Sequence, residues 1–535
     1  MTDSLKNVRT RAASTHRPFA QNPVSTPSRA DQVRTDGGGY AFPISDRDQV
    51  TRFLILGSEK SFYRSGAEQT KLNSAVVTKL AADRASGLAL VDLIVEISTA
   101  GRAPKVNPAI FALAVAASSP DDDVRSYALS KLSAVARTGT HLFLFAGYVE
   151  QFRGWGRALK RAIADWYLDK SADKAAYQTV KYRQREGWSH RDLFRLSHPE
   201  SADASFKGLG AWVLRGNSDE APAIIQGFVK AQAPGADVPT LVREYGLSWE
   251  MLPTESLNDV KVWEALLEGS LPLGALLRQL PRLTRLGMFP ALGGQPSKVV
   301  ARLNDVEELR RARLHPINIL VAMKTYAQGR SVKGDGTWTP NQKIVDALSK
   351  AFYLAYETVE PTNKNTLIGV DVSGSMGGSY YGSPLPGGIS PAEIAAAISM
   401  VTLATEPNSA VYGFATNLVE LPISPTQRLD DVLKTTIRSN FGSTNPGALF
   451  EKAIQDKLPV ETFIVVTDND VNNGRHVHEL LQKYRSKTGI DAKLIVLATS
   501  SNDYTIGDPN DPGTLNLAGF DSAIPTLISD FSRGI

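Results

Sequence analysis

The 535-residue chain contains no cysteine. The lack of thiols excludes disulfides and zinc sites built on thiolates, and it suits a reducing compartment. No stretch approaches the roughly 20 uninterrupted apolar residues that a membrane span needs, and the first residues, MTDSLKNVRTRAASTHRPF, lack the apolar core of a signal peptide. The sequence therefore predicts a cytoplasmic protein without a membrane-spanning segment.

The small net charge, +4, hides an asymmetry along the chain. Residues 364–535 hold 12 Lys and Arg against 18 Asp and Glu, a net charge of −6, which leaves +10 for residues 1–363. The length and the 42% hydrophobic content predict two or three domains with sizeable cores. A basic first part favours a polyanionic partner, whereas an acidic second part does not.

A strand followed by oxygen-bearing side chains lies at Thr366–Met376, TLIGVDVSGSM. The apolar, β-branched run is typical of a strand buried on both faces of a parallel sheet. Asp371, Ser373 and Ser375 follow in the loop at its carboxyl end, where open α/β sheets bind ligands, and hard oxygen ligands are those that Mg²⁺ selects. The alternative is an ordinary strand-to-helix turn in which Asp and Ser act as local caps.

Two downstream segments complete the pattern. Thr444 lies in FGSTNPG at the start of an expected helix, and Asp468 ends the buried strand TFIVVTD. DxSxS followed by this Thr and this Asp resembles the metal-ion-dependent adhesion site of von Willebrand factor A domains. The resemblance implies Mg²⁺ or another divalent cation bound by Asp371, Ser373, Ser375, Thr444 and Asp468, which should lie within about 4 Å of one point.

Composition divides the chain into three regions. Residues 1–36 predict a disordered, mildly basic arm, because they are rich in Ser, Thr, Arg and Pro without apolar periodicity. Residues 37–363 are predicted to be mostly helical, since amphipathic periods of ten to fifteen residues follow one another. Stacked helices of this kind resemble HEAT repeats, although no clean repeat appears in the letters, and an irregular helical domain is the alternative.

Residues 364–535 alternate strands and helices. This order predicts a doubly wound α/β domain with a parallel sheet and one antiparallel edge. Helices are expected at 391–405, 428–437, 446–455, 477–485 and 523–531, and strands at 410–414, 418–423, 462–468 and 492–498. The loop at 377–390 is longer than expected, and it either covers the metal or presents Tyr380 and Tyr381 to a partner.

The strongest concentration of cations in the helical part interleaves with aromatic residues. Arg157, Lys160 and Arg161 share one helix face, and Tyr182 and Trp188 lie among the cations that follow. RNA-binding proteins use such a composition, in which cations contact phosphates and aromatic side chains stack on unpaired bases. The alternative is a solvated helix face whose aromatic side chains lie in the core. The candidate RNA-binding residues are Arg157, Lys160, Arg161, Lys174, Lys181, Arg183, Arg185, His190, Arg191 and Arg195.

Several long motifs appear in a family's order, among them GWGRALKRAIADWY, KYRQREGWSHRDLFRLSHP and RRARLHPINILVAMKTYAQG. With the A domain that follows, they resemble the Ro autoantigen family, most closely its bacterial Ro-sixty-related members. The resemblance covers about 37–535 and implies a TROVE module, a HEAT-like helical ring closed by the A domain. It also implies small noncoding Y RNA on the outer basic surface, single-stranded RNA ends in a central hole, and an exoribonuclease bridged by RNA.

In the family, the histidine of the GWSH motif contributes to RNA binding, which implies that role for His190; a buried capping histidine is the alternative. We expect a non-enzymatic, monomeric RNA-binding ring. A metal-dependent protein-adhesion scaffold that uses the A domain is the second hypothesis. An enzyme with Asp371 as phosphoacceptor or Ser373 as nucleophile lacks support, because no His lies near either in sequence and no Walker loop is present.

Overall fold

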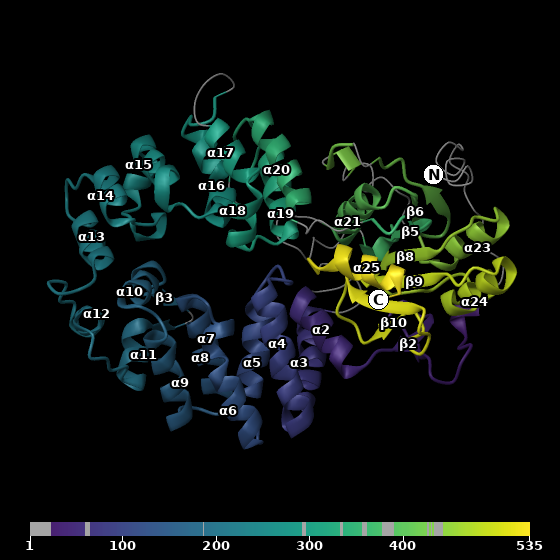
Figure 1. The fold of residues 1–535 in the computed structure, drawn as a ribbon, viewed down its shortest axis with the longest axis horizontal. Helices are drawn as coiled ribbons and strands as arrows, with labels where there is room; N and C mark the ends of the chain where they lie inside the picture. Colours follow the sequence, from purple (N-terminus) through teal and green to yellow (C-terminus); the bar gives the residue numbers. More distant parts are fainter. Residues whose placement is uncertain are drawn as a thin grey trace.

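The chain folds into a long helical array and an α/β domain, which lie beside one another (Figure 1). The structure, a computed structural model, describes residues 23–58, 65–185, 187–290, 296–331, 335–355, 361–376, 390–424, 427–429, 431–432, 442–519 and 521–534. The expected role of the 377–390 loop, including Tyr380 and Tyr381, falls almost entirely outside these residues. Among the described residues, no helix is both long enough and apolar enough to cross a membrane.

The helices of the array begin at side chains that satisfy their free N–H groups. Ser65 caps α3 in a reciprocal capping box with Glu68, and Ser189 caps α11 in the same way with Asp192. The array comprises α2 (Asp46–Leu56), α3 (Gly66–Ala82), α4 (Arg84–Ala100), α5 (Asn107–Ala116), α6 (Asp122–Ser130), α7 (Leu132–Val135), α8 (Gly139–Phe152), α9 (Arg157–Leu168), α10 (Ala172–Lys181), α11 (His190–Ser197), α12 (Ala204–Arg215), α13 (Ala223–Ala231), α14 (Val238–Tyr245), α15 (Val260–Ala265), α16 (Leu273–Arg285), α17 (Pro296–Leu303), α18 (Val306–Ala312), α19 (Pro316–Ala327) and α20 (Gln342–Leu354).

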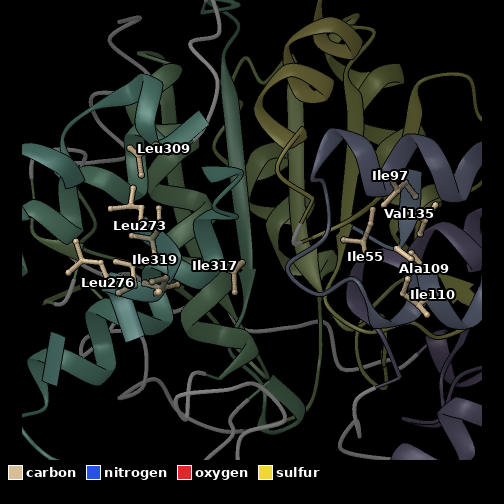
Figure 2. Packing of buried hydrophobic residues seen from close by; sticks show 14 of the residues in the cluster. Ile55, Ile97, Ala109, Ile110, Val135, Leu273, Leu276, Leu309, Ile317 and Ile319 are labelled. Carbon is tan, nitrogen blue, oxygen red and sulfur yellow. The ribbon is translucent and has the colours of Figure 1, made fainter. Parts of the chain in front are cut away.

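The array closes on itself. Its helices run along one side of the molecule, turn at α12 and α13, and return as α14 to α20 toward the α/β domain (Figure 1). The loop after α4 then meets the start of α19, because His315 Nε2 lies 3.1 Å from the carbonyl oxygen of Arg102 and Asn318 donates to the carbonyl of Pro104. Figure 2 shows apolar side chains of the first and last helices on the two sides of this junction. The predicted helical ring is therefore confirmed.

The α/β domain is built on one six-stranded sheet in the order β11 (Thr514–Ala518), β9 (Lys493–Ala498), β8 (Thr462–Thr467), β5 (Thr366–Asp371), β6 (Ser409–Phe414) and β7 (Leu418–Glu420). All neighbours are parallel except β6 and β7. The same domain contains the helices α21 (Pro391–Thr405), α23 (Gly447–Gln455), α24 (Val477–Thr488) and α25 (Ile524–Arg533). The predicted doubly wound A domain with an antiparallel edge is confirmed.

The α/β domain is fastened to both ends of the ring. Arg102, after α4, donates from its guanidinium to the buried carboxylate of Asp521, with Nε 3.0 Å from Oδ2. Lys324, on α19, donates to the buried carboxylate of Glu393 at the start of α21, at 2.5 and 2.7 Å. Each pair contains a carboxylate that is 2% exposed, so losing the cation would leave a buried charge uncompensated.

Part of the expected disordered arm is ordered. From residue 23 the chain lies on the α/β domain, where β1 (Val33–Arg34) pairs with β2 (Tyr40–Pro43) and β2 pairs with β10 (Tyr504–Thr505). Val24 is buried, and Thr35 donates to the carbonyl of Val471. The composition of residues 23–36 therefore misled the prediction, because their order comes from contacts made with residues more than 400 positions away.

Other differences are local. The helical stretch after α5 is divided at Lys131 into α6 and α7, and the edge strand β11 was not predicted. The helix expected at 428–437 falls mostly outside the described residues. A two-stranded hairpin, β3 (Gln184–Arg185) and β4 (Trp188–Ser189), was also missed in the helical part, and it lies among the candidate RNA-binding residues.

Candidate functional sites at the metal edge and the basic face

The first candidate site, the metal edge, lies at the carboxyl end of the sheet and comprises Asp371, Ser373, Ser375, Thr444 and Asp468. Asp371 ends β5, which runs between β6 and β8, so its side chain is fully buried. One carboxylate oxygen accepts a hydrogen bond from the Ser373 N–H at 3.0 Å, and the other accepts from the Thr467 hydroxyl at 2.7 Å. The local cap of the alternative interpretation is thus present, since the Ser373 N–H donates to Asp371.

The neighbouring strand supplies the second carboxylate. Asp468 follows β8 and is 6% exposed, and its carboxylate accepts a hydrogen bond from the Ser375 hydroxyl. The Ser375 hydroxyl also lies 3.0 Å from the Ser373 hydroxyl. Burial, and then the charge of Asp468, raise the pKa of Asp371 to about 7; burial also raises the pKa of Asp468. Two carboxylates that disfavour each other's ionisation would be stabilised by a cation between them.

Thr444 is held over the end of β5 by backbone contacts to the loops on either side. Its N–H donates to the Asn472 side chain at 2.8 Å, and its carbonyl accepts from the N–H groups of Asn472 and Asn473, which follow β8. The next residue, Asn445, donates from its N–H to the carbonyl of Ala415, which follows β6. Thr444 therefore lies at the same edge as the two carboxylates, and its convergence with them on one ion stays a prediction.

The donor set of the metal edge fits a hard cation. Two carboxylates and three hydroxyls offer only oxygen, which is the ligand chemistry of Mg²⁺. In the part of the chain that the structure describes, no group of three or more His, Asp and Glu side chains is arranged to hold a metal. A cation at this edge would consequently depend on the hydroxyls of Ser373, Ser375 and Thr444, with water completing the shell.

The metal edge also contacts the helical ring. Asn502 donates from its side chain to the carbonyl of Asp468 at 2.6 Å. The buried guanidinium of Arg52, on α2, donates to the carbonyls of Asn502 and Tyr504 at 3.2 and 2.8 Å. Burial lowers the pKa of Arg52 to about 10, although the charges of Asp48 and Asp503 act in the opposite direction. Sequence reasoning missed this link, since nothing in the letters joins residue 52 to residue 502.

The second candidate site, the basic face, comprises α9, the β3–β4 hairpin and α11. On α9, Leu159, Ile163 and Trp166 are buried, and Arg157 and Arg161 are exposed on the opposite side, with Lys160 half-buried. The face that the i, i+3, i+4 spacing predicted for these cations is therefore directed to solvent. Lys174, at the start of α10, is also exposed.

The hairpin adds two exposed cations beside an aromatic pair. Arg183 and Arg185 are exposed, and the guanidinium of Arg183 lies 5.3 Å from the ring centroid of Phe228. Arg185 pairs across the hairpin with Trp188, whose ring lies 5.2 Å from that of Trp155. Trp155 and Trp188 are only partly buried, so both present ring surface near the cations.

Lys181 differs from the other candidates. Its side chain is 8% exposed, and its ammonium group lies 3.7 Å from a carboxylate oxygen of Glu250 and 3.1 Å from the Tyr177 hydroxyl. On α11, Arg191 and Arg195 are both exposed, and Arg191 also donates to the carbonyl of Leu214 at 2.7 Å. The structure thus leaves Lys181 with little surface for a phosphate.

His190 is inside the protein. It is 3% exposed, its ring lies 4.7 Å from that of Phe143, and its Nδ1 lies 2.7 Å from the Tyr167 hydroxyl. Burial lowers the pKa of this imidazole to about 3. As the first residue of α11, directly after the Ser189 cap, His190 matches the buried alternative left open by the sequence. A direct stack of His190 on an RNA base therefore does not fit the structure, because the ring has no free face.

Comparison with known proteins gives consistent matches over nearly the whole chain. Residues 33–218 and 244–325 match the TROVE domain, and residues 365–532 match the Ro60 vWA domain. The chain is 34% identical to the RNA-binding protein RO60 of Caenorhabditis elegans, covering 94% of this chain and 90% of the relative. It is 36% identical to the RNA-binding protein RO60 of Deinococcus radiodurans, covering 96% and 98%.

A solved structure matches at the level of the fold. The crystal structure of the Deinococcus radiodurans RO (RSR) protein aligns with 92% of this chain and 100% of its own, with a TM-score of 0.69 and 34% identity.

Proposed function

Because this chain belongs to the Ro60 family, we propose that it is a non-enzymatic RNA-binding ring. It binds small noncoding Y RNAs on the outer basic face, and it takes single-stranded 3′ ends of RNA through a central hole. Its role is in the stability, quality control and maturation of noncoding RNA in the cytoplasm, as a monomer that RNA bridges to an exoribonuclease.

The basic face carries the proposal. Arg157, Arg161, Arg183, Arg185 and Arg195 are exposed on neighbouring elements, together with half-buried Lys160. Phosphate contacts of this kind dominate RNA affinity and give it a strong salt dependence. With six such cations on single-stranded or distorted RNA, log K should fall with log salt at a slope of about −4.

The closed ring supports the second part of the proposal. A central hole lined by Lys and Arg would admit a single strand and exclude an A-form duplex, so we expect free 3′ ends to bind in preference to blunt duplexes. The junction of α19 with the loop after α4 is what makes the array a ring instead of an open superhelix.

Sequencing of RNA that copurifies with the protein tests the proposal most directly. Mobility shifts with a small structured RNA, an oligonucleotide with a free 3′ end and a blunt duplex then separate the two modes of binding. We expect the first two probes to bind and the third to bind weakly. Absence of copurified RNA, together with no shift for any probe at physiological salt, would exclude an RNA-binding function.

A second function is favoured by the two buried carboxylates that lie on neighbouring strands at the metal edge. Asp371 and Asp468 would hold a divalent cation, with the hydroxyls of Ser373, Ser375 and Thr444 orienting toward it. When bound, such a cation supplies an open position that accepts a carboxylate from a protein partner. Capture of a protein partner that depends on Mg²⁺, and that EDTA reverses, would support this adhesion function beside RNA binding.

A further inference from the structure

Three aromatic side chains contact one another in a row that leads from the core of the helical ring to its surface. We call this row the aromatic ladder. Phe111, on α5, lies edge-to-face with Tyr148 and Phe152 of α8, with ring centroids 5.5 and 5.9 Å apart. Tyr148 and Phe152 are one turn apart on α8, and their rings are nearly parallel, at 7° and 6.3 Å. Beneath them, buried Phe53 contacts Phe111 at 6.0 Å.

The outermost ring of this ladder is open to solvent. Phe152 is 43% exposed, and within the described residues it is the one aromatic among the exposed large hydrophobic side chains, since the others are Val33, Leu168, Val229 and Val306. Tyr148 and Phe111 are partly buried. One part of the Phe152 ring packs on Phe111 and Tyr148, which orient it, and the other part is open to solvent.

One exposed cation lies beside the ladder. Arg153 follows Phe152 directly, whereas Glu150 of the same helix accepts a hydrogen bond from the Trp155 indole N–H. Gly147 of α8 lies under the indole of Trp188, since a Cβ at Gly147 would approach the indole nitrogen to 3.5 Å. The aromatic ladder and the aromatic pair of the basic face consequently occupy adjacent faces of α8.

This combination suits an unpaired base. An exposed aromatic ring offers a flat face on which an unpaired base can stack, because every base has a π-face. Exposed Arg153, the residue after Phe152, would contact a phosphate of the same strand.

We propose that Phe152, parallel to Tyr148 and supported by Phe111, forms a stacking platform for an unpaired base of bound RNA, adjacent to the basic face. This inference rests on the proposed RNA-binding function and adds to it a defined subsite. The platform serves any base, because stacking tolerates sequence, and it acts on single-stranded segments only.

The test uses the full-length protein and a single-stranded oligonucleotide that contains 2-aminopurine, whose fluorescence is quenched on stacking. Phe152→Ala should weaken binding about tenfold and remove most of the quenching, without changing the salt slope. Phe152→Trp should retain both properties, and Phe152→Leu should behave like Phe152→Ala although it keeps an apolar side chain. Val306→Ala, at a site with 39% exposure on α18, is the matched control and should bind like the wild type.

The outcomes separate the platform from the broader function. If the wild type binds the oligonucleotide and Phe152→Ala binds and quenches equally well, the platform is excluded while RNA binding stands. If Phe152→Leu matches the wild type, the patch is an apolar contact surface for another partner and the stacking role is wrong. If the wild type binds no RNA at all, both proposals fail. Because the substitutions also remove contacts with Phe111 and Tyr148, binding is measured below the melting temperature of every variant.

Discussion

The metal edge and the basic face are both built from side chains at short sequence spacings, but they differ in what fixes those side chains in space. At the metal edge, β5 and β8 are adjacent parallel strands, and each ends in a buried aspartate. On the basic face, the cations come from a helix, a hairpin and a second helix, whose relative placement depends on packing between them. The end of a strand within a sheet therefore fixes the position of a side chain closely. The charged face of a helix fixes only the direction in which its side chains point.

This difference explains the two residues that the structure removes from the RNA surface. His190 and Lys181 belong to the same charged stretch as Arg185 and Arg195, yet both are directed inward, toward Tyr167 and Glu250 respectively. Composition could not distinguish them, because the contacts that bury them come from residues 23 and 69 positions away. The following predictions test whether the metal edge and the basic face act as independently as their construction indicates.

The largest effect is expected at the metal edge. Asp371→Ala should reduce Mg²⁺ affinity at least 100-fold, because it removes the central carboxylate of an all-oxygen donor set. Affinity of the same variant for structured RNA should change less than twofold, since the basic face lies in the other part of the molecule. Calorimetric titration with Mg²⁺ and a mobility shift measure the two.

Stability provides the control for that variant. In EDTA, Asp371→Asn should unfold at a temperature equal to or above that of the wild type, because it removes the repulsion between Asp371 and Asp468. A variant that loses both Mg²⁺ and RNA binding without unfolding would show that the two sites are coupled, most directly through Asn502 and Arg52.

The next effect concerns His190 as a structural residue. His190→Ala should lower the free energy of unfolding by about 2–4 kcal/mol, since it leaves a cavity among Phe143 and Tyr167. RNA binding, measured at a temperature where the variant is folded, should fall only through displacement of the hairpin. A variant of unchanged stability that nonetheless binds RNA tenfold more weakly would restore the direct role that the resemblance implied.

The lowered pKa of His190 also predicts that the stability of the protein depends on pH. Its pKa is about 3 in the folded protein and about 6.5 in an unfolded chain, so the unfolded state takes up the proton first. The stability contributed by neutral His190 is complete above pH 6.5 and is lost as the pH falls toward 3, by about 2 kcal/mol at pH 5. Urea unfolding of wild type and His190→Leu at pH 7.5 and 5 should show a smaller loss in the variant.

The sequence predicted the fold, including the strands that lead to Asp371 and Asp468, more completely than the exposure of the cations on the basic face. The helix at Pro391–Thr405 was predicted to the residue, because a capping Ser, a Pro at the first position and an uninterrupted apolar run define it. The strand β11 and the ordered segment from residue 23 were missed, since Thr514–Ala518 and Val33–Arg34 become strands only through their partners. Hydrophobic periodicity indicates local structure, whereas strand pairing between residues far apart in the sequence leaves little trace in it.

A double substitution tests how much two cations of the basic face contribute to RNA binding. Arg157→Ala with Arg161→Ala should weaken RNA binding about tenfold and change the salt slope from about −4 to about −2.6, because two phosphate contacts are lost. Lys483→Ala with Lys487→Ala is the control, as these exposed lysines have the same spacing on α24 in the acidic part of the chain. Equal effects of the two pairs would mean that the protein's overall charge, and no defined face, governs binding.

The smallest effect gives the sharpest comparison, because Lys181 and Arg185 are four residues apart in one charged stretch. Arg185 is exposed on the hairpin, so Arg185→Ala should weaken RNA binding about threefold to fivefold and flatten the salt slope by about 0.7.

Lys181 already has Glu250 and Tyr177 as partners, which raise its pKa against the opposing effect of burial. Lys181→Ala should therefore change RNA affinity less than twofold and leave the slope unaltered, although it should cost some stability by leaving Glu250 unpaired. Titrations of both variants with one structured RNA at several salt concentrations make the comparison. Equal changes in slope would mean that RNA displaces Glu250 from Lys181, and that the charged stretch acts as the sequence alone predicts.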